Sequence, residues 1–121
     1  VYRTLAHNGA VFLTAPSAFT RQTGEAHWHV LLRARAIETG CFVFAAAQGG
    51  VHENGRETYG HSLIVSPWGE ILAEADTEPG VIFADIDTAL VEDARSRIPS
   101  LTHDREFGIA APDRPGVRKA S

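Results

Sequence analysis

The stretch that decides the fold is residues 23–48, which read TGEAHWHVLLRARAIETGCFVFAAAQ. From Thr23 to Gly40, apolar residues recur at helical spacing and give the predicted helix a broad apolar face. Thr23 is the predicted N-cap, and Gly40 is the glycine expected just after the last turn. Residues 41–48 are apolar without alternation, which is typical of a strand covered on both faces. A helix followed by a buried strand predicts a layered architecture of the α+β class.

The same criteria, applied outward from this stretch, predict the remaining elements. On the N-terminal side we expect a helix over residues 1–6, stopped by Asn8-Gly9, and a buried strand over 10–15. On the C-terminal side we expect a loop or hairpin over 49–60 that turns at Asn54-Gly55, a second hairpin with strands 61–65 and 71–75, a strand over 81–86, and a helix with Leu90, Val91, Ala94 and Ile98 as its apolar stripe. Such a sheet needs a partner on its uncovered face. The domain is predicted over residues 1–107, and 108–121 are predicted to be a flexible tail.

Composition places the chain among ordinary globular proteins and argues against several partners. It has 121 residues, 44% of them hydrophobic, and a formal charge of -4. Because no basic surface is expected, neither nucleic acid nor an anionic membrane surface is a predicted partner. The longest apolar run, residues 41–47, is far shorter than the roughly 20 residues of a membrane-spanning helix. A single cysteine and no recognisable signal peptide predict a reducing, cytoplasmic environment.

The start of the sequence predicts that the chain is incomplete. It contains no methionine, and residues 1–6 read as a helix already under way, without an N-cap. A processed or engineered terminus is the alternative interpretation.

No residue in the sequence qualifies as a catalytic or metal-binding group by its own pattern. Cys41 opens an apolar strand, where burial would block a thiolate from reacting, so it is predicted to be structural. His27 and His29 would point to different sides of a helix, and neither a His-Glu-x-x-His motif nor a cysteine pair occurs. Glu38 is predicted to form an ion pair with Arg35. The sequence therefore predicts no metal site, no cofactor and no self-sufficient catalytic centre.

Four motifs in a fixed order resemble the nitrilase superfamily of carbon-nitrogen hydrolases. The motifs are residues 16–20 (PSAFT), 23–28 (TGEAHW), 33–38 (RARAIE) and the pair YGHS and PWG between 59 and 69. The resemblance extends from residue 1 to about Arg105 and points to the branch of omega-amidases and deaminated glutathione amidases. It implies part of a four-layer α-β-β-α sandwich with a mixed sheet and flanking helices.

The resemblance also implies a mechanism and a site. In the family a cysteine attacks a small linear amide and forms a thioester, a glutamate acts as base, and a lysine stabilises the oxyanion. The nucleophile lies in a Cys-x-Asp-x-Arg-Phe-Pro-Glu type segment just before the helix that residues 1–6 match. All three catalytic residues are thus expected upstream of this chain, which alone is predicted to be inactive. The predicted substrate-binding residues are Ser17, Ala18, Phe19 and Thr20.

The helix that carries Arg33, Arg35 and Glu38 resembles one that the family buries against a second subunit. This predicts a homodimer or higher homo-oligomer, with a small-molecule amide as substrate. The sequence departs from the family in two places. Ser66 stands where aspartate is usual, and His29 stands where glutamate is common, which leaves the substrate open.

Two other functions stay open from the sequence. The chain could be a noncatalytic oligomerisation or interaction module, or a decayed remnant of an enzyme. An independent metal-dependent hydrolase using the histidines would require bound metal and lacks the usual ligand spacing.

Overall fold

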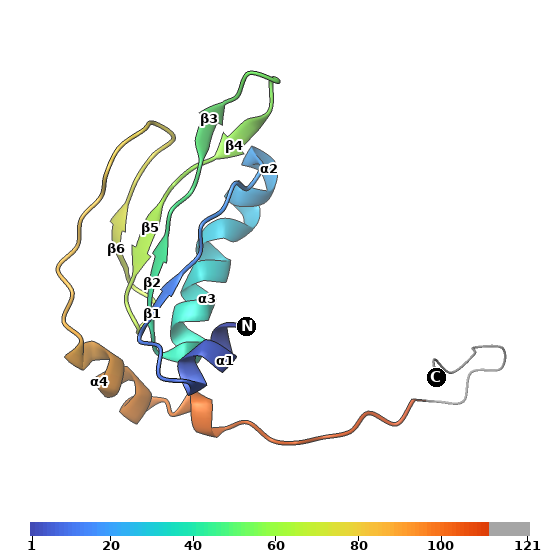
Figure 1. The fold of residues 1–121 in the computed structure, drawn as a ribbon, viewed down its shortest axis with the longest axis vertical. Helices are drawn as coiled ribbons and strands as arrows, with labels where there is room; N and C mark the ends of the chain where they lie inside the picture. The colour runs from blue at the N-terminus through green and yellow to red at the C-terminus, as the bar shows by residue number, and fades with distance from the viewer. Residues whose placement is uncertain (112–121) are drawn as a thin grey trace.

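The computed structural model describes residues 1–111 and shows one mixed sheet with a long helical segment along one face (Figure 1). The elements are α1 (Tyr2–His7), β1 (Phe12–Thr14), α2 (Arg21–Thr23), the π-helical turn η1 (Gly24–Trp28), α3 (His29–Thr39), β2 (Phe42–Ala45), β3 (Gly49–Val51), β4 (Glu57–Tyr59), β5 (Leu63–Val65), β6 (Ile71–Glu74), α4 (Ala89–Arg97) and the 3-10 turn η2 (Ser100–Thr102). The predicted tail, 108–121, is described only as far as residue 111, and the rest lies outside the described residues.

The sheet has the order β1-β2-β5-β6. β1 and β2 run parallel with Leu13 opposite Val43, whereas β2 and β5 run antiparallel with Phe44 opposite Ile64. The central strand β2 is buried almost throughout, which confirms the prediction of a strand covered on both faces. β3 and β4 form a separate hairpin around the predicted turn at Asn54-Gly55.

The helical segment differs from its prediction at the start. It begins at Arg21, with Thr20 in the cap position, so the prediction of Thr23 as N-cap was wrong. Thr23 lies inside the helix, where its hydroxyl donates to the Thr20 carbonyl at 3.2 Å. Gly40 ends the helix with φ of 63°, as predicted.

Only part of the helix's apolar surface faces the sheet. The buried side chains, Trp28, Leu32 and Ala36, follow one another at intervals of four residues and contribute to the main core. Val30 and Ile37 are exposed, with 69% and 45% of their surface accessible. The outer face of α3 therefore carries apolar side chains that the described residues leave at least partly exposed.

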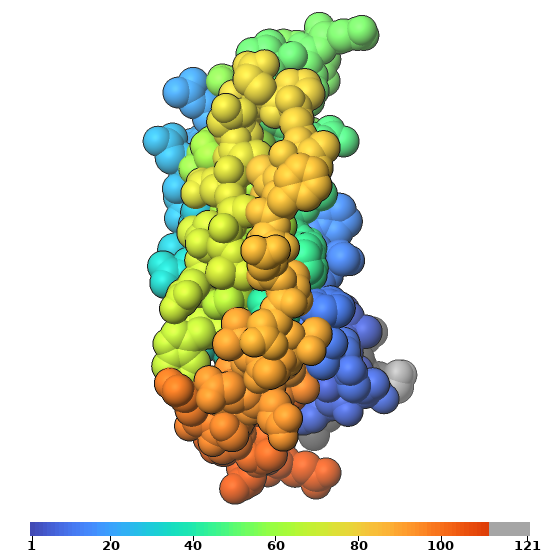
Figure 2. Space-filling view, turned by 90° about the vertical axis from the view of Figure 1, so that its left-hand side faces the viewer, coloured from blue at the N-terminus to red at the C-terminus, as the bar shows by residue number. Residues whose placement is uncertain are grey.

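The predicted strand over 81–86 is not a strand in the structure. The segment is extended, with Ile82, Ala84 and Ile86 half-buried and the alternate residues exposed. It makes no backbone hydrogen bond to any described residue, because no neighbouring strand lies alongside its edge. Figure 2 shows this amber segment crossing the surface of the molecule down to α4. The sequence pattern of a strand is present, and the pairing partner is not among residues 1–111.

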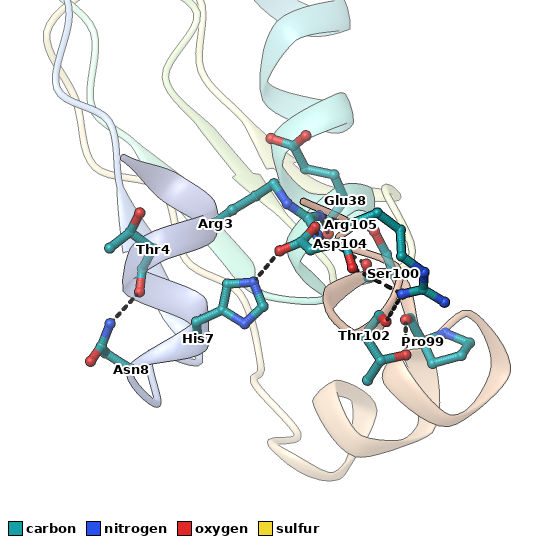
Figure 3. Close-up of polar contacts among 10 residues, drawn as sticks. All are labelled: Arg3, Thr4, His7, Asn8, Glu38, Pro99, Ser100, Thr102, Asp104 and Arg105. Atoms are coloured by element: carbon teal, nitrogen blue, oxygen red, sulfur yellow. Dashed lines mark hydrogen bonds and ion pairs between the residues drawn. The ribbon is translucent and has the colours of Figure 1, made fainter. Parts of the chain in front are cut away.

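A cluster of polar contacts, here called the clasp, joins Arg3 and His7 of α1 to Glu38, Ser100 and Asp104 (Figure 3). One guanidinium nitrogen of Arg3 donates to the Glu38 carbonyl at 3.0 Å, and the other donates to the Ser100 carbonyl at 2.9 Å. Arg3 also pairs with the Asp104 carboxylate, which meets His7 Nε2 at 2.6 Å. α1 is thereby tied to α3 and to the segment after η2.

From the contacts of Asp104 in the clasp, we predict a contribution to the free energy of unfolding that is lost at low pH. The hydrogen bonds from His7 and Arg3 hold the pKa of Asp104 below its usual value of 3.8. A carboxyl with a lowered folded-state pKa stabilises the fold above its unfolded pKa, and that contribution is lost as the pH falls through the folded value. We expect Asp104→Asn to be less stable than wild type at about pH 6, and the difference to shrink toward about pH 3. Urea unfolding at both pH values measures this; a difference that is independent of pH would contradict the role of the carboxylate.

Among residues 1–111, no helix has both the length and the apolar character needed to cross a membrane.

Candidate active-site wall

The predicted substrate-binding loop, residues 17–20, follows β1 at the edge where the carboxyl ends of parallel strands β1 and β2 meet. Its backbone is held on both sides. The Ser17 amide donates to the Ala46 carbonyl at 2.9 Å, and the Ser17 carbonyl accepts from the Gln48 amide at 3.0 Å. Further along, the Phe19 carbonyl accepts from the Tyr59 amide at 2.9 Å. The loop is thus fixed to the end of β2 and to β4.

The four side chains of this loop have different roles. Phe19 is half-buried and packs edge-on against Trp28, with 5.0 Å between ring centroids. The Ser17 hydroxyl lies 3.4 Å from the Ala15 carbonyl, and the Thr20 hydroxyl lies 2.7 Å from that of Thr23. Ala18 is exposed. None of these groups is an acid or a base, so the loop can shape a pocket but cannot supply its chemistry.

Two adjoining hollows lie near the loop, and none of residues 17–20 lines either of them. An apolar one of about 390 Å³ is lined by Thr14, Pro16, Phe44, Ala45, Ala46, Ser62, Leu63, Ile64, Gly80, Val81 and Ile82. A more polar one of about 300 Å³ is lined by Ala47, Gln48, Gly49, His52, Ser62, Ala75, Asp76, Thr77, Glu78, Pro79 and Gly80. They share Ser62 and Gly80. Pro16, the residue immediately before the loop, is one of the residues that line the apolar hollow.

Sequence reasoning missed the importance of His61 and Ser62. His61 is the one non-glycine residue among 1–111 with a positive φ, at 59°. Its unusual backbone turns Ser62 toward Ala47, whose amide donates to the Ser62 hydroxyl at 2.9 Å. The preceding glycine, Gly60, was a visible turn signal, but nothing in the sequence shows which residue after it takes the left-handed conformation.

Cys41 is fully buried, as predicted for a cysteine at the start of an apolar strand. Its thiol donates to the Ala10 carbonyl at 3.3 Å, and the Arg95 guanidinium lies 3.3 Å from the sulfur. Arg95 also donates to the carbonyls of Thr39 and Ala10. The thiol is packed between the start of β2 and Arg95 of α4, and its complete burial keeps a substrate from reaching it.

His29, the departure from the family pattern, takes part in an aromatic and charged cluster on the helix side of the sheet. Its Nε2 lies 2.6 Å from the Glu74 carboxylate, and its ring meets Tyr59 edge-on at 5.9 Å. Burial, reinforced by the charges of Glu74 and Glu25, raises the pKa of Tyr59. His29 therefore links α3 to β6 and does not approach residues 17–20 through any described contact.

The predicted ion pair between Arg35 and Glu38 is present at 2.7 Å. Over the described part of the chain, no three His, Cys, Asp or Glu side chains converge as metal ligands would. The described residues thus supply the sheet with its helices, the loop over residues 17–20 and the two hollows.

Comparison with known proteins identifies the class to which this scaffold belongs. The family model described as carbon-nitrogen hydrolase matches residues 1–96, and the chain belongs to this family. Its nitrilase-like α+β fold and its place in the nitrilase superfamily, both expected from the sequence, are confirmed.

The chain is similar to a curated relative and to a solved structure in this family. The chain is 52% identical over 101 residues to human deaminated glutathione amidase, covering 84% of this chain and 31% of that protein. Among solved structures, it is similar to Saccharomyces cerevisiae Nit3, a member of branch 10 of the nitrilase superfamily, with TM-score 0.80, 36% identity, and coverage of 88% of this chain and 39% of Nit3.

A second similar structure bears on the chemistry. It is a mutant of the amidase from Nesterenkonia sp. AN1 that shows covalent addition of the acetamide moiety of fluoroacetamide at the active-site cysteine. Its TM-score is 0.62 and its identity 30%, with coverage of 81% of this chain and 37% of that one. The chain spans about a third of the length of these relatives.

Proposed function

We propose that this chain forms the C-terminal part of an amidase that cleaves a small linear amide through a cysteine thioester. The observation that carries the proposal is the state of Cys41, the only cysteine in the sequence. Cys41 is fully buried and hydrogen-bonded to Ala10 and Arg95. In contrast, a relative of known structure reacts at an active-site cysteine. The nucleophile, the glutamate base and the oxyanion-binding lysine then lie in sequence outside this chain.

In this proposal, residues 17–20 form one wall of the substrate pocket. The loop is firmly held by backbone hydrogen bonds, and Pro16, the residue immediately before it, lines an apolar hollow of about 390 Å³. Sites that bind small molecules combine apolar linings with a few fixed polar groups, which is the composition found here. The name of the human relative favours deaminated glutathione as substrate, and the omega-amide of a 2-oxo acid is the other candidate that the family resemblance implies.

The test is ammonia release by the purified 121-residue chain from alpha-ketoglutaramate and from deaminated glutathione. We expect none, because binding contacts produce no turnover without the nucleophile that forms the intermediate. Human deaminated glutathione amidase, assayed in parallel, shows that the assay detects such activity. Ammonia release by the chain alone would contradict the proposal that its catalytic residues lie elsewhere.

We also propose that the complete enzyme is a cytoplasmic homodimer or higher homo-oligomer that associates through the outer face of α3. Val30 and Ile37 leave apolar surface on that face, and the same helix carries the charged side chains of Arg33 and Glu38. Apolar surface rimmed by charges is typical of protein interfaces. Sedimentation velocity on the complete enzyme tests the proposal, and the mass of one chain would contradict it. Association without any hydrolytic activity would instead favour the interaction module.

A further inference from the structure

We propose that Ser62 is the residue that positions the substrate loop, acting through Ala47 and the Ser17 backbone, in the amidase proposed above. Only the role of residues 17–20 in substrate binding rests on the proposed function. The positioning itself is a property of the described structure and is testable without any catalysis.

The first step is the anchoring of His61. Its left-handed backbone, with φ of 59°, is unfavourable for a side chain with a Cβ and persists only where the surroundings enforce it. The His61 amide donates to the Asp76 carbonyl at 3.1 Å, and its carbonyl accepts from the indole nitrogen of Trp28 at 2.8 Å. Its ring nitrogen Nδ1 lies 2.6 Å from the Tyr59 carbonyl. The turn before Ser62 is therefore fixed from the helix, from β4 and from the segment after β6.

The second step is the contact that Ser62 makes with the end of β2. Its hydroxyl accepts a hydrogen bond from the Ala47 amide at 2.9 Å and lies 3.4 Å from the Ala47 carbonyl. The Ser62 hydroxyl thus contacts both the amide and the carbonyl of Ala47, which lies beyond the end of β2. It replaces the backbone pairing that ends where β2 and β5 separate, since their last paired residues are Ala45 and Leu63.

The third step joins Ala47 to the loop. Ser17 and Ala47 form an isolated parallel bridge, made by the Ser17 amide on Ala46 and by the Gln48 amide on the Ser17 carbonyl. The position of residues 46–48 therefore decides the position of Ser17. Ser62 also lines both hollows, whereas residues 17–20 line neither, so the loop is positioned from the side on which the hollows lie.

Together these contacts form a chain of support from buried Trp28, through His61 and Ser62, to Ala47 and Ser17. Binding groups held by such supporting contacts keep the geometry that a substrate requires, and small displacements weaken binding or turnover. The hydrogen bonds of the Ser62 hydroxyl go to Ala47 and not to residues 17–20, so its effect on the loop is indirect.

The test is amide hydrogen exchange on the 121-residue chain, comparing wild type with Ser62→Ala, Ser62→Thr and Ser66→Ala. Ser66 is the matched control, because its hydroxyl also accepts from backbone amides, those of Trp68 and Glu70, at the other end of β5. We expect Ser62→Ala to speed exchange about 10-fold at Ala47, Ser17 and Gln48, as loss of one hydrogen bond predicts. The amides of Val43 and Val65 should be unchanged, and Ser62→Thr should restore protection.

Ser66→Ala should speed exchange only near its own turn. Unchanged exchange at Ser17 and Gln48 in Ser62→Ala would overturn the proposal, and so would equal acceleration throughout the sheet. If Ser62→Ala does not fold, the comparison of Ser62→Thr with Ser62→Cys decides the matter, because the thiol is a weaker acceptor and should loosen only residues 17 and 46–48.

The functional arm uses the complete enzyme. There Ser62→Ala should raise KM about 5-fold while kcat changes less, because a binding wall contributes equally to ground and transition states. Local loosening without any change in KM would overturn the role of residues 17–20 in substrate binding and leave the positioning intact. The two arms thereby distinguish failure of the positioning role of Ser62 from failure of the proposed binding role of residues 17–20.

Discussion

Replacing Trp28 by alanine is expected to lower the free energy of unfolding by about 3–5 kcal/mol, the range for removing a large aromatic side chain from a core. Trp28 is 2% exposed and packs against Phe19, and its indole nitrogen holds the His61 carbonyl. The substitution therefore creates a cavity and also leaves a carbonyl without its partner. Urea unfolding followed by far-ultraviolet circular dichroism measures the change.

The matched control is Trp68→Ala, the same substitution at the only other tryptophan. Trp68 is 47% exposed, and Arg97 lies over its ring at 5.6 Å. An exposed contact between a cation and a ring contributes about 0.5–1 kcal/mol, so we expect a loss near this size plus a small packing term. Equal losses at the two positions would contradict the assignment of Trp28 to the core and Trp68 to the surface.

Replacing Gly24 by alanine is expected to cost about 2–3 kcal/mol, at the upper end for overpacking a dense interior. A Cβ on Gly24 would overlap the Cβ and the ring of Tyr59, so the helical turn and the hairpin strand β4 would have to separate. At this point the Tyr59 side chain of β4 packs directly on the backbone of η1 at Gly24. Thermal unfolding measures the loss, and Gly80→Ala, where a Cβ meets nothing within 4 Å, is the control.

A double substitution tests the cause of this effect. If the overlap with Tyr59 is responsible, Tyr59→Gly, which removes the Cβ as well as the ring, should recover part of the stability lost in Gly24→Ala, and the two changes should not be additive. Additive losses would show that Gly24 matters for another reason, such as the path of the π-helical turn.

The sequence predicted the elements whose formation depends on local pattern. β2, both hairpins, the helix ending at Gly40 and the C-terminal helix all lie where apolar spacing and turn residues place them. The start of the long helix was misplaced because Thr20 and Thr23 are equally good N-caps, and only tertiary contacts decide between them. The π-helical turn leaves no trace in a pattern of period 3.6.

Residues 81–86 show the limit of strand prediction. Their alternation is real, since Ile82, Ala84 and Ile86 are the half-buried members, but a ladder also needs a second strand. No described residue supplies one.

The candidate site divides in the same way. The position of residues 17–20 follows from the family resemblance, and the structure places them at the strand ends. Ser62 lies in the YGHS motif, but its role could not be predicted from the pattern, because that role depends on the backbone turn at His61 and on the distant residue Ala47. Supporting residues of this kind are defined by geometry between segments far apart in sequence.

The most direct test of the account is ammonia release by the continuous reading frame that includes the DNA upstream of Val1, compared with the 121-residue chain alone. We predict that the longer polypeptide contains a Cys-x-Asp-x-Arg-Phe-Pro-Glu type segment, hydrolyses alpha-ketoglutaramate or deaminated glutathione, and loses activity when that cysteine is replaced by alanine, whereas Cys41→Ala retains it. A longer polypeptide that folds but releases no ammonia, or one whose activity depends on Cys41, would contradict the account.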